Sequence, residues 1–401
     1  MPRSLRFTAP LAMIACAVSL SLSGQSDYNA NQLRVKKFFA DRQQQALDEP
    51  FVGIATSDGI QPGLFPIEAT GVTTQPMVDA ADTFLAALSP AQQLRTVFAV
   101  DDTEWRRWCN VDNGIYIRQG VPLKELHGTV RDAARNLMRT TLSAKGLALA
   151  DAIRKTDETL RELNQSDLEY DEELYFFTVM GLPSTTEPWG WQLDGHHLII
   201  NTFVLGDQVV MTPTFLGGEP IHTTTGKHAG NHILQDEQNQ GLALMQSLTP
   251  EQQTAATLAP EKTHNDNQAE AFKDNVIVDY AGVRVATFTP AQKARLLDLI
   301  GLYIHNQAEG HARVRMAEIE THLDDTWFGW VGAATDDAVF YYRIHSPVVL
   351  IEFDHQTPVG THMINERGRI TRDHIHTVIR TPNGNDYGKD LLRQHLEAHP
   401  H

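Results

Sequence analysis

The hydrophobic pattern of the chain changes its period near Tyr175, and this change limits the folds that the sequence can adopt. Up to about residue 168, apolar residues recur at helical spacing, most clearly over Leu123–Lys145 and Leu147–Leu163. After Tyr175, short strand-like runs follow one another with helical segments between them. No alternating strand-helix units, G-x-G-x-x-G pattern or Walker loop occurs. The sequence predicts an α+β fold with a helical N-terminal half packed on an antiparallel sheet.

The strand-like runs fall into two groups. The first group is Leu174–Met180, Trp189–Gln192, His197–Leu205 and Gln208–Thr212, with a hairpin turn at Gly206-Asp207. The second group is Thr326–Val331, Ala338–Ile344, Val348–Phe353 and His374–Arg380. A helix is expected again over Asp386–His395.

Three expected helix starts share one capping signature, in which Ser or Thr is followed by Pro and, three residues on, by Gln. The capping residues are Ser89, Thr249 and Thr289, and they predict helices over about 90–99, 250–257 and 290–306. The segments around these starts do not otherwise repeat. We therefore interpret them as helix caps and not as signs of an internal repeat.

Residues 1–23 have the pattern of an export signal. Arg3 and Arg6 precede the uncharged run Phe7–Leu22, and Ser21-Leu22-Ser23 offers small residues to a signal peptidase. The run is short for a membrane span. A buried N-terminal helix is one alternative, and a lipoprotein signal ending at Cys16 is another. We expect a periplasmic or secreted protein, with an N-terminal extension at residues 24–75 and a single α+β domain at residues 76–398.

The composition of the chain limits the classes of partner that the protein is expected to bind. The 401 residues include 33 Lys and Arg against 50 Asp and Glu, a formal net charge of −17. Binding to a phosphate backbone needs a concentrated basic surface, so nucleic acid is not an expected partner. No further run is long and apolar enough for a membrane span. Cleavage after residue 23 leaves Cys109 as the one cysteine, so no internal disulfide is expected. The sequence does not indicate an oligomeric state.

Histidines give the strongest sign of chemistry, because imidazole is the commonest protein ligand of zinc, copper and iron. His374 and His376 stand two apart on an expected strand and therefore share one face. His196 and His197 would point to opposite faces, so one of them should reach the same ion. The other could bind a second ion, donate a hydrogen bond or lie in the core.

Glu352 lies in an apolar expected strand, where an unpaired carboxylate is costly. A metal ion could compensate this charge, and pairing with Arg343 or Arg380 is the alternative. A purely structural interpretation also stands, in which the histidines pack in the core and Glu352 pairs with Arg343.

The same segments resemble the family called domain of unknown function 3500 (DUF3500). The resemblance covers most of residues 75–398 and rests on these motifs: Trp189–His197, Pro213–Gly217, Tyr341–Ile344, Ile351–Asp354, His374–Thr377, Asp386–Gly388 and His395. The family pattern has Asn at the position of Asp373 and usually Gly at His345-Ser346, so His345 is left out of the expected site. The resemblance implies no activity. It does imply that the double His, the Glu and the His-x-His form one set.

We therefore expect an exported metal-dependent enzyme that acts on a small organic substrate. Its divalent ion would be held by His196 or His197 with His374, His376 and Glu352, leaving positions free for water or substrate.

Other polar residues have expected roles beside the ion. Asp194 or Asp354 would orient ligands or act as general base, and Arg343 or Arg380 would hold an anionic substrate group. Zinc is the first choice, with hydrolysis by a metal-bound hydroxide. The hard carboxylate ligand and the absence of thiolate or clustered Met ligands favour hydrolysis. Copper or iron would imply redox chemistry, and a non-catalytic metal- or ligand-binding protein is the alternative from another class.

Overall fold

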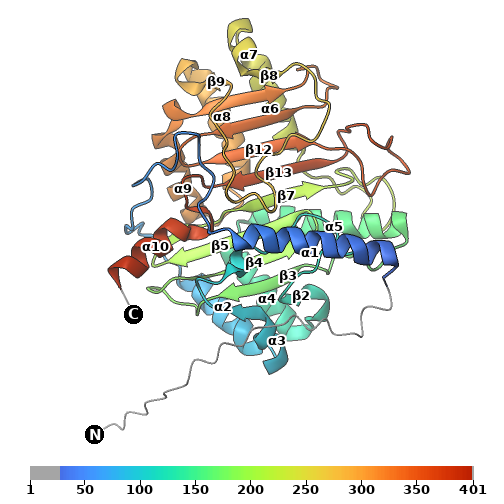
Figure 1. The fold of residues 1–401 in the computed structure, drawn as a ribbon, viewed down its shortest axis with the longest axis vertical. Coiled ribbons are helices and arrows are strands. Elements are labelled where there is room, and N and C mark those ends of the chain that lie inside the picture. The colour runs from blue at the N-terminus through green and yellow to red at the C-terminus, as the bar shows by residue number, and fades with distance from the viewer. Residues whose placement is uncertain (1–27, 400–401) are drawn as a thin grey trace.

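The structure is a computed structural model that describes residues 28–399. The expected export signal and Cys16 lie outside these residues. Within them, one sheet of thirteen strands runs through the molecule in the order β1-β3-β4-β5-β7-β13-β12-β11-β10-β8, with β2, β6 and β9 paired beside it (Figure 1). Ten α-helices accompany the sheet. The predicted α+β class is confirmed.

The elements agree with most of the expected segments. The helices are α1 (Ala30–Asp48), α2 (Gln75–Ala87), α3 (Pro90–Thr96), α4 (Gly128–Thr141), α5 (Ala144–Asn164), α6 (Gln235–Ser247), α7 (Pro250–Ala256), α8 (Pro290–Ile304), α9 (Glu309–Thr321) and α10 (Lys389–Ala398). The strands are β1 (Val97–Phe98), β2 (Val121–Pro122), β3 (Phe176–Met180), β4 (Trp189–Gly195), β5 (Leu198–Leu205), β6 (Gln208–Val210), β7 (Thr214–Gly218), β8 (Thr257–Ala259), β9 (Val283–Arg284), β10 (Trp327–Val331), β11 (Tyr341–His345), β12 (Leu350–His355) and β13 (Ile375–Arg380). Helices α6 and α9 were not predicted.

Strand pairing is antiparallel throughout the interior of the sheet, as expected. The parallel pairs are at its two ends, where β1 runs alongside β3 and β8 runs alongside β10. The central pair joins β7 to β13, with Phe215 opposite Val378 and Thr214 opposite Ile379. Strands β3–β5 and β10–β13 are almost completely buried, which explains why they read as apolar runs rather than alternating ones.

The two halves of the fold repeat each other. With β6 set aside, which has no counterpart, the order α2-α3-β1-β2-α4-α5-β3-β4-β5-β7 in the first half recurs as α6-α7-β8-β9-α8-α9-β10-β11-β12-β13 in the second. The two sets of strands extend outward from β7 and β13 in the same order, as a pseudo-twofold axis between those strands requires. Ser89 and Thr249 therefore cap equivalent helices. The interpretation of the caps as unrelated to a repeat is corrected by this topology.

Helix caps form as predicted. Ser89, Thr249 and Thr289 each accept a hydrogen bond from the backbone N–H three residues on. The side chain of the Gln at that position accepts the backbone N–H of the capping residue. The same arrangement starts α1, where Asn29 is the N-cap and the Gln32 side chain accepts the Asn29 backbone N–H. That helix was not predicted, although its Asn-x-x-Gln signature stands in the sequence.

Helix α1 crosses in front of the strands of the first half (Figure 1). Its two buried side chains are polar: Lys36 Nζ donates to the carbonyl of Asn113 at 2.7 Å, and Gln43 Nε2 donates to the carbonyl of Arg106 at 3.2 Å. The helix thus fastens the loops on this face of the sheet.

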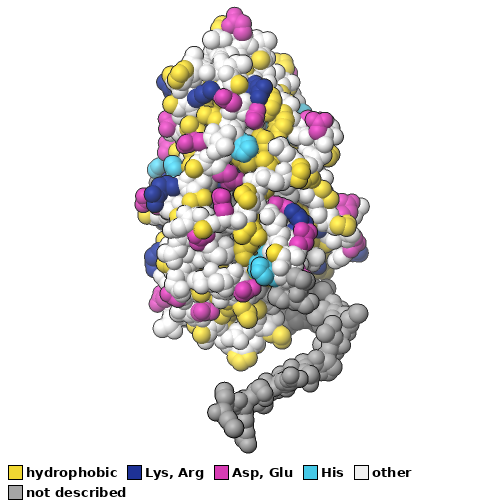
Figure 2. Space-filling model, turned by 90° about the vertical axis from the view of Figure 1, so that its left-hand side faces the viewer, with side chains coloured by type: hydrophobic (Ala, Val, Ile, Leu, Met, Phe, Trp, Pro, Cys, Tyr) yellow, Lys and Arg dark blue, Asp and Glu magenta, His cyan; other side chains and the backbone are white. Residues whose placement is uncertain are grey.

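The distribution of charged side chains and the apolar character of the helices fit the acidic composition of the sequence. On the face shown in Figure 2, Lys and Arg side chains stand in small separate groups among acidic and apolar ones. None of the helices within residues 28–399 combines the length and the apolar character that a membrane span needs. Cys109 is buried and forms no disulfide, and burial raises the pKa of its thiol to about 12.

A buried histidine at the end of β11 should make stability depend on pH. Burial, with Arg343 nearby, lowers the pKa of His345 to about 3, so the ring is neutral in the folded chain. The unfolded chain, with a histidine pKa near 6.5, binds the proton more readily below that pH. Unfolding in urea should therefore show that His345 removes about 2 kcal/mol of stability between pH 6.5 and pH 5. The variant His345→Gln should have a shallower pH dependence, and identical slopes would contradict this assignment.

Candidate metal centre

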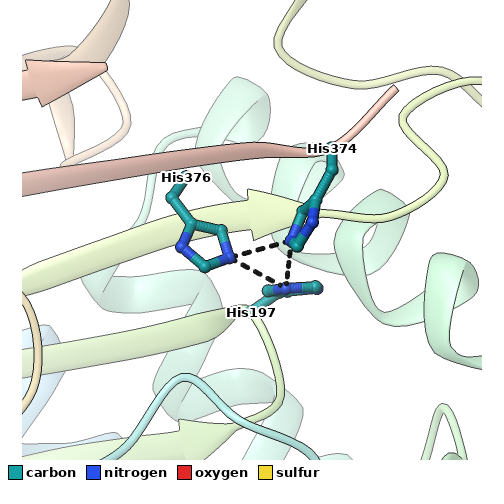
Figure 3. A group of neighbouring side chains, drawn as sticks. All are labelled: His197, His374 and His376. Atoms are coloured by element: carbon teal, nitrogen blue, oxygen red, sulfur yellow. Dashed lines mark hydrogen bonds between the residues drawn. The ribbon is translucent and has the colours of Figure 1, made fainter. Parts of the chain in front are cut away.

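Three histidine side chains converge on one point at one end of the central strands β4, β5, β7 and β13. The Nε2 atoms of His197, His374 and His376 lie 3.3 Å (197–374), 3.0 Å (374–376) and 3.2 Å (197–376) apart. Figure 3 shows the three rings pointing toward one another. Within residues 28–399, these three histidines form a group of His, Cys, Asp or Glu side chains whose ligand atoms lie close enough together to hold one ion.

The two repeated halves supply the ligands jointly. His197 lies in the two-residue turn between β4 and β5 and has a φ of 59°. His374 and His376 come from the start of β13 in the second half. Strand β7 lies between them, and its Gly217 pairs with His376 and donates its N–H to the carbonyl of His197 at 2.8 Å. A Cβ at Gly217 would lie 2.8 Å from the Ile375 carbonyl oxygen and 3.3 Å from the His376 ring, so the close approach of β7 to the start of β13 requires glycine here.

The spacing of the nitrogens suits a transition-metal ion. Imidazole nitrogens bind zinc at about 2.0–2.1 Å, so two of them lie about 2.9 Å apart at a right angle and about 3.4 Å apart at a tetrahedral angle. All three observed separations fall within this range.

Hydrogen bonds at the far side of two rings fix which nitrogen carries the proton. His374 Nδ1 lies 2.8 Å from the carbonyl oxygen of Thr357, and His376 Nδ1 lies 2.8 Å from a carboxylate oxygen of Glu270. Both partners only accept, so both Nδ1 atoms are donors and, in the neutral rings, both Nε2 atoms bear lone pairs. Two lone pairs 3.0 Å apart repel each other unless a cation lies between them. A metal ion bound to both nitrogens removes this repulsion, as would a proton shared between them.

Burial keeps the rings of His197 and His374 neutral, as metal ligands must be. Burial, reinforced by the neighbouring histidines, lowers the pKa of His197 well below its usual range. Burial also lowers the pKa of His374 to about 4, against the opposing effect of Glu219. His376 is the most open of the three, with 10% of its side chain exposed.

Two loops hold the proton-accepting partners in place. The Glu219 carboxylate lies 3.5 Å from His374 Nδ1 and accepts the backbone N–H groups of Val359, Gly360 and Thr361. It thereby fastens the loop whose Thr357 carbonyl binds His374. On the other side, Glu270 has 23% of its side chain exposed and stands beside His376 at the open edge of the group.

The variant Glu270→Gln should bind zinc about 10- to 100-fold more weakly, because outer carboxylates that bind a ligand histidine raise its basicity and fix its orientation. Competition with a chelating dye measures this affinity. Glu366→Gln, which changes an exposed carboxylate paired with Arg369, is the matched control and should leave the affinity unchanged. Equal zinc affinities for Glu270→Gln and the unmodified protein would show that Glu270 does not support the ligand.

His196 does not join the group, although it is next to a ligand. Its ring stacks on that of His197 with centroids 3.8 Å apart, and its Nδ1 lies 2.6 Å from the carboxylate of Asp157 on α5. Although burial opposes it, Asp157 raises the pKa of His196. Tyr175 donates to the same carboxylate at 2.8 Å. The expectation of opposite faces assumed a regular strand, whereas both residues lie in a turn, which places the rings face to face.

The two strand carboxylates of the expected site anchor a loop instead of reaching the histidines. Glu352 is fully buried and accepts from the N–H groups of Gln268 and Ala269 and from the Tyr341 hydroxyl at 2.6 Å. Asp354 accepts from the N–H of Asp266 at 2.7 Å and pairs with Lys262 at 2.8 Å. The structure thus places both carboxylates under residues 266–269, directly before Glu270.

Asp194 and the two arginines of the expected site also bind groups other than the three histidines. Asp194 pairs with Arg118 at 3.2 Å, beneath the loop that contains Cys109. Arg343 donates to the Gln268 side chain and the Asp279 carbonyl. Arg380 pairs with Asp274 and Asp386, each at 2.7 Å. None of the three bonds to the histidine group, and both arginines are occupied by acceptors of the chain itself.

Four residues near the ligands were not predicted: Asp157, Glu219, Glu270 and Thr357. Each comes from a helix, strand end or loop distant in sequence from the histidine it contacts, and no local motif marks it. The buried charge of Glu352 was a usable sign, because it required compensation; the compensating groups are backbone N–H donors and a tyrosine.

Comparison with known proteins gives a family and no activity. The sequence pattern of the family described as "Protein of unknown function (DUF3500)" matches residues 70–389, which include all three histidines of the group. Neither a curated protein nor a solved structure matches the chain.

Proposed function

Since the chain belongs to the DUF3500 family, whose name assigns no activity, we propose from the site itself that the protein is a metal-dependent enzyme. His197, His374 and His376 would hold one divalent ion, with zinc as the first choice and hydrolysis as the reaction. The observation that carries the proposal is the 3.0 Å approach of two lone-pair nitrogens, His374 Nδ1 and His376 Nδ1 both being held as donors.

The number of ligands favours catalysis over a structural role. Structural zinc sites are closed by four protein ligands, whereas catalytic sites keep three and leave a position for water or substrate. Within residues 28–399, no fourth His, Cys, Asp or Glu joins the three histidines. The partly exposed Glu270 beside His376 gives the open position an approach from solvent.

Hydrolysis is favoured by the neutrality of the ligands. The expected carboxylate ligand, Glu352, is occupied elsewhere, so it no longer supports this choice. Three neutral imidazoles leave the full positive charge of a bound zinc ion in place, and such an ion acidifies its water to a pKa near 7. Glu270 and the Thr357 carbonyl hold the ligand rings in the required tautomer.

A redox enzyme is the second candidate, because an all-nitrogen ligand set also binds copper more tightly than zinc in the usual affinity order. The two candidates differ in what they consume. A copper or iron enzyme would use oxygen or another oxidant, whereas a zinc hydrolase needs only water.

Activity assays on protein loaded with one metal at a time test the proposal. The apo protein would receive zinc, copper or iron and be assayed on a panel of nitrophenyl esters, phosphates and glycosides, with oxygen uptake measured in parallel. We expect hydrolysis with zinc that is absent in His374→Ala/His376→Ala and retained in His228→Ala, a histidine paired with Glu172. Oxygen uptake with copper or iron and no hydrolysis would favour the redox enzyme. Failure of every metal to bind would overturn both.

We also propose that the protein is exported, on the strength of the charged, apolar and small-residue pattern of residues 1–23. Mass spectrometry of the protein from its source cells should give a mature chain beginning at Gly24. A lipid-modified Cys16 would favour the lipoprotein alternative, and an intact N-terminus in the cytoplasm would overturn export.

A further inference from the structure

The pseudo-twofold axis gives the histidine site a counterpart at the other end of the central strands. A path across paired residues from the first residue of β3 leads to Phe215 on β7, and the same path from the first residue of β10 leads to Arg380 on β13. Met211 and His376 each lie four residues before these two positions. The counterpart of a metal ligand is therefore a methionine.

A cavity of about 550 Å³ lies beside Met211. Its walls come from the loop before α2, from β6, from α9 and from α10, and the two helices lie next to each other at the left of Figure 1. The larger part of the wall is apolar and includes Leu64, Val210, Val314 and Leu391. Small-molecule sites have volumes of about 300–1,000 Å³ and mainly apolar walls with a few polar groups, so this cavity has the size and the lining of such a site.

A buried histidine of this cavity has no partner. His311 is 6% exposed, and within residues 28–399 no hydrogen bond or ion pair reaches its ring. Burial lowers the pKa of His311, so the ring is neutral at pH 7. A neutral imidazole has one N–H donor and one lone pair, and it is costly to leave them without partners away from water. A hydroxyl group both donates and accepts, so it could bind either nitrogen.

The charged groups of the wall do not favour a charged ligand. Arg315 pairs with Glu318. Its guanidinium also donates to the carbonyl of Val348 at 2.6 Å and to the hydroxyl of Thr381 at 3.1 Å. Apart from the histidines, the other charged residue among the described residues of the wall is Glu68, which is exposed. An anion would find no free cation here, and a cation would lose its water in a mainly apolar space.

We propose that this cavity binds a neutral small molecule with an apolar body and a hydroxyl group, which forms a hydrogen bond with His311. The site is separate from the metal centre, because Met211 precedes β7 and His376 begins β13, and these two strands are antiparallel. The duplication thus provides two sites in equivalent places, one for an ion and one for an organic ligand. The second site does not depend on the proposed enzyme activity.

Three probes that share one ring test the proposal: p-cresol, toluene and p-toluate, which carry a hydroxyl group, no polar group and a negative charge. Calorimetry on the full chain should show p-cresol binding about fivefold more tightly than toluene, as expected from one hydrogen bond with a net value of about 1 kcal/mol. The anionic p-toluate should bind no more tightly than toluene. Equal binding of p-cresol and toluene, tightest binding of p-toluate, or binding of none of the three would overturn the proposal.

Variants show whether His311 is responsible. His311→Leu should bind toluene as before and lose the preference for p-cresol, whereas His311→Gln, whose amide can replace a ring nitrogen, should keep part of it. His127→Leu changes an exposed histidine whose side chain makes no capping bond, and it should keep the full preference. The same holds for His374→Ala/His376→Ala, so the result is independent of the metal centre. An undiminished preference in both His311 variants would contradict the role of this residue.

Discussion

Replacing Arg380 by methionine should lower the free energy of unfolding by about 3–5 kcal/mol, the cost of breaking a buried ion pair from one side. Arg380 is fully buried, and its guanidinium binds Asp274 and Asp386, each at 2.7 Å. Its removal leaves the Asp386 carboxylate, which is also fully buried, with the N–H of Thr381 as its other donor. Urea denaturation followed by circular dichroism measures the loss.

Two further variants separate this structural role from a catalytic one. Arg343→Met removes an arginine whose acceptors are uncharged, the Gln268 amide and a carbonyl, so it should cost less than Arg380→Met. Arg380→Met/Asp386→Asn removes both charges of one pair and should recover part of the loss. An Arg380→Met protein of unchanged stability and reduced activity would instead place Arg380 in the catalytic machinery.

Zinc should stabilise the folded chain strongly. An ion that binds the folded state alone adds about 4 kcal/mol to the free energy of unfolding when its free concentration is 1,000 times its Kd. The three Nε2 atoms would supply this binding, because they lie 3.0–3.3 Å apart. Urea titrations at buffered free zinc concentrations measure the increment.

The matched variant for this prediction is His374→Ala/His376→Ala, which should lose the increment. The same variant need not be unstable without metal, because it removes the repulsion between the two Nε2 atoms. A protein that zinc leaves unchanged, or a variant that zinc stabilises as much as the unmodified chain, would contradict the three-histidine centre.

Local patterns were sufficient to predict much of the fold. The cap at Ser89 and its two counterparts begin α3, α7 and α8, and the apolar runs after Tyr175 correspond to β3–β5 and β10–β13. The same-face argument for His374 and His376 is confirmed by the convergence of their Nε2 atoms. Each of these features depends on residues within one turn or one strand, where sequence spacing determines geometry.

The remaining features depend on contacts between distant segments. The internal duplication is a matter of topology, and its trace at the equivalent helices α3 and α7 is short: residues 88–93 read Leu-Ser-Pro-Ala-Gln-Gln and residues 248–253 read Leu-Thr-Pro-Glu-Gln-Gln. His197 meets the β13 histidines because β7, the last strand of the first half, pairs with β13 and has glycine at position 217. Glu270 reaches His376 because Glu352 and Asp354 bind the backbone of the preceding residues. The spacing of residues in the sequence does not indicate which distant segments come into contact.

X-ray absorption spectroscopy of the zinc-loaded protein, with metal content measured on the same sample, tests the central claim most directly. The structure predicts one zinc per chain with three imidazole nitrogens at about 2.0–2.1 Å and a solvent oxygen completing the coordination. The His374→Ala/His376→Ala protein should retain no zinc. A protein without bound zinc, or a zinc ion closed by four protein ligands, would contradict an open three-histidine centre.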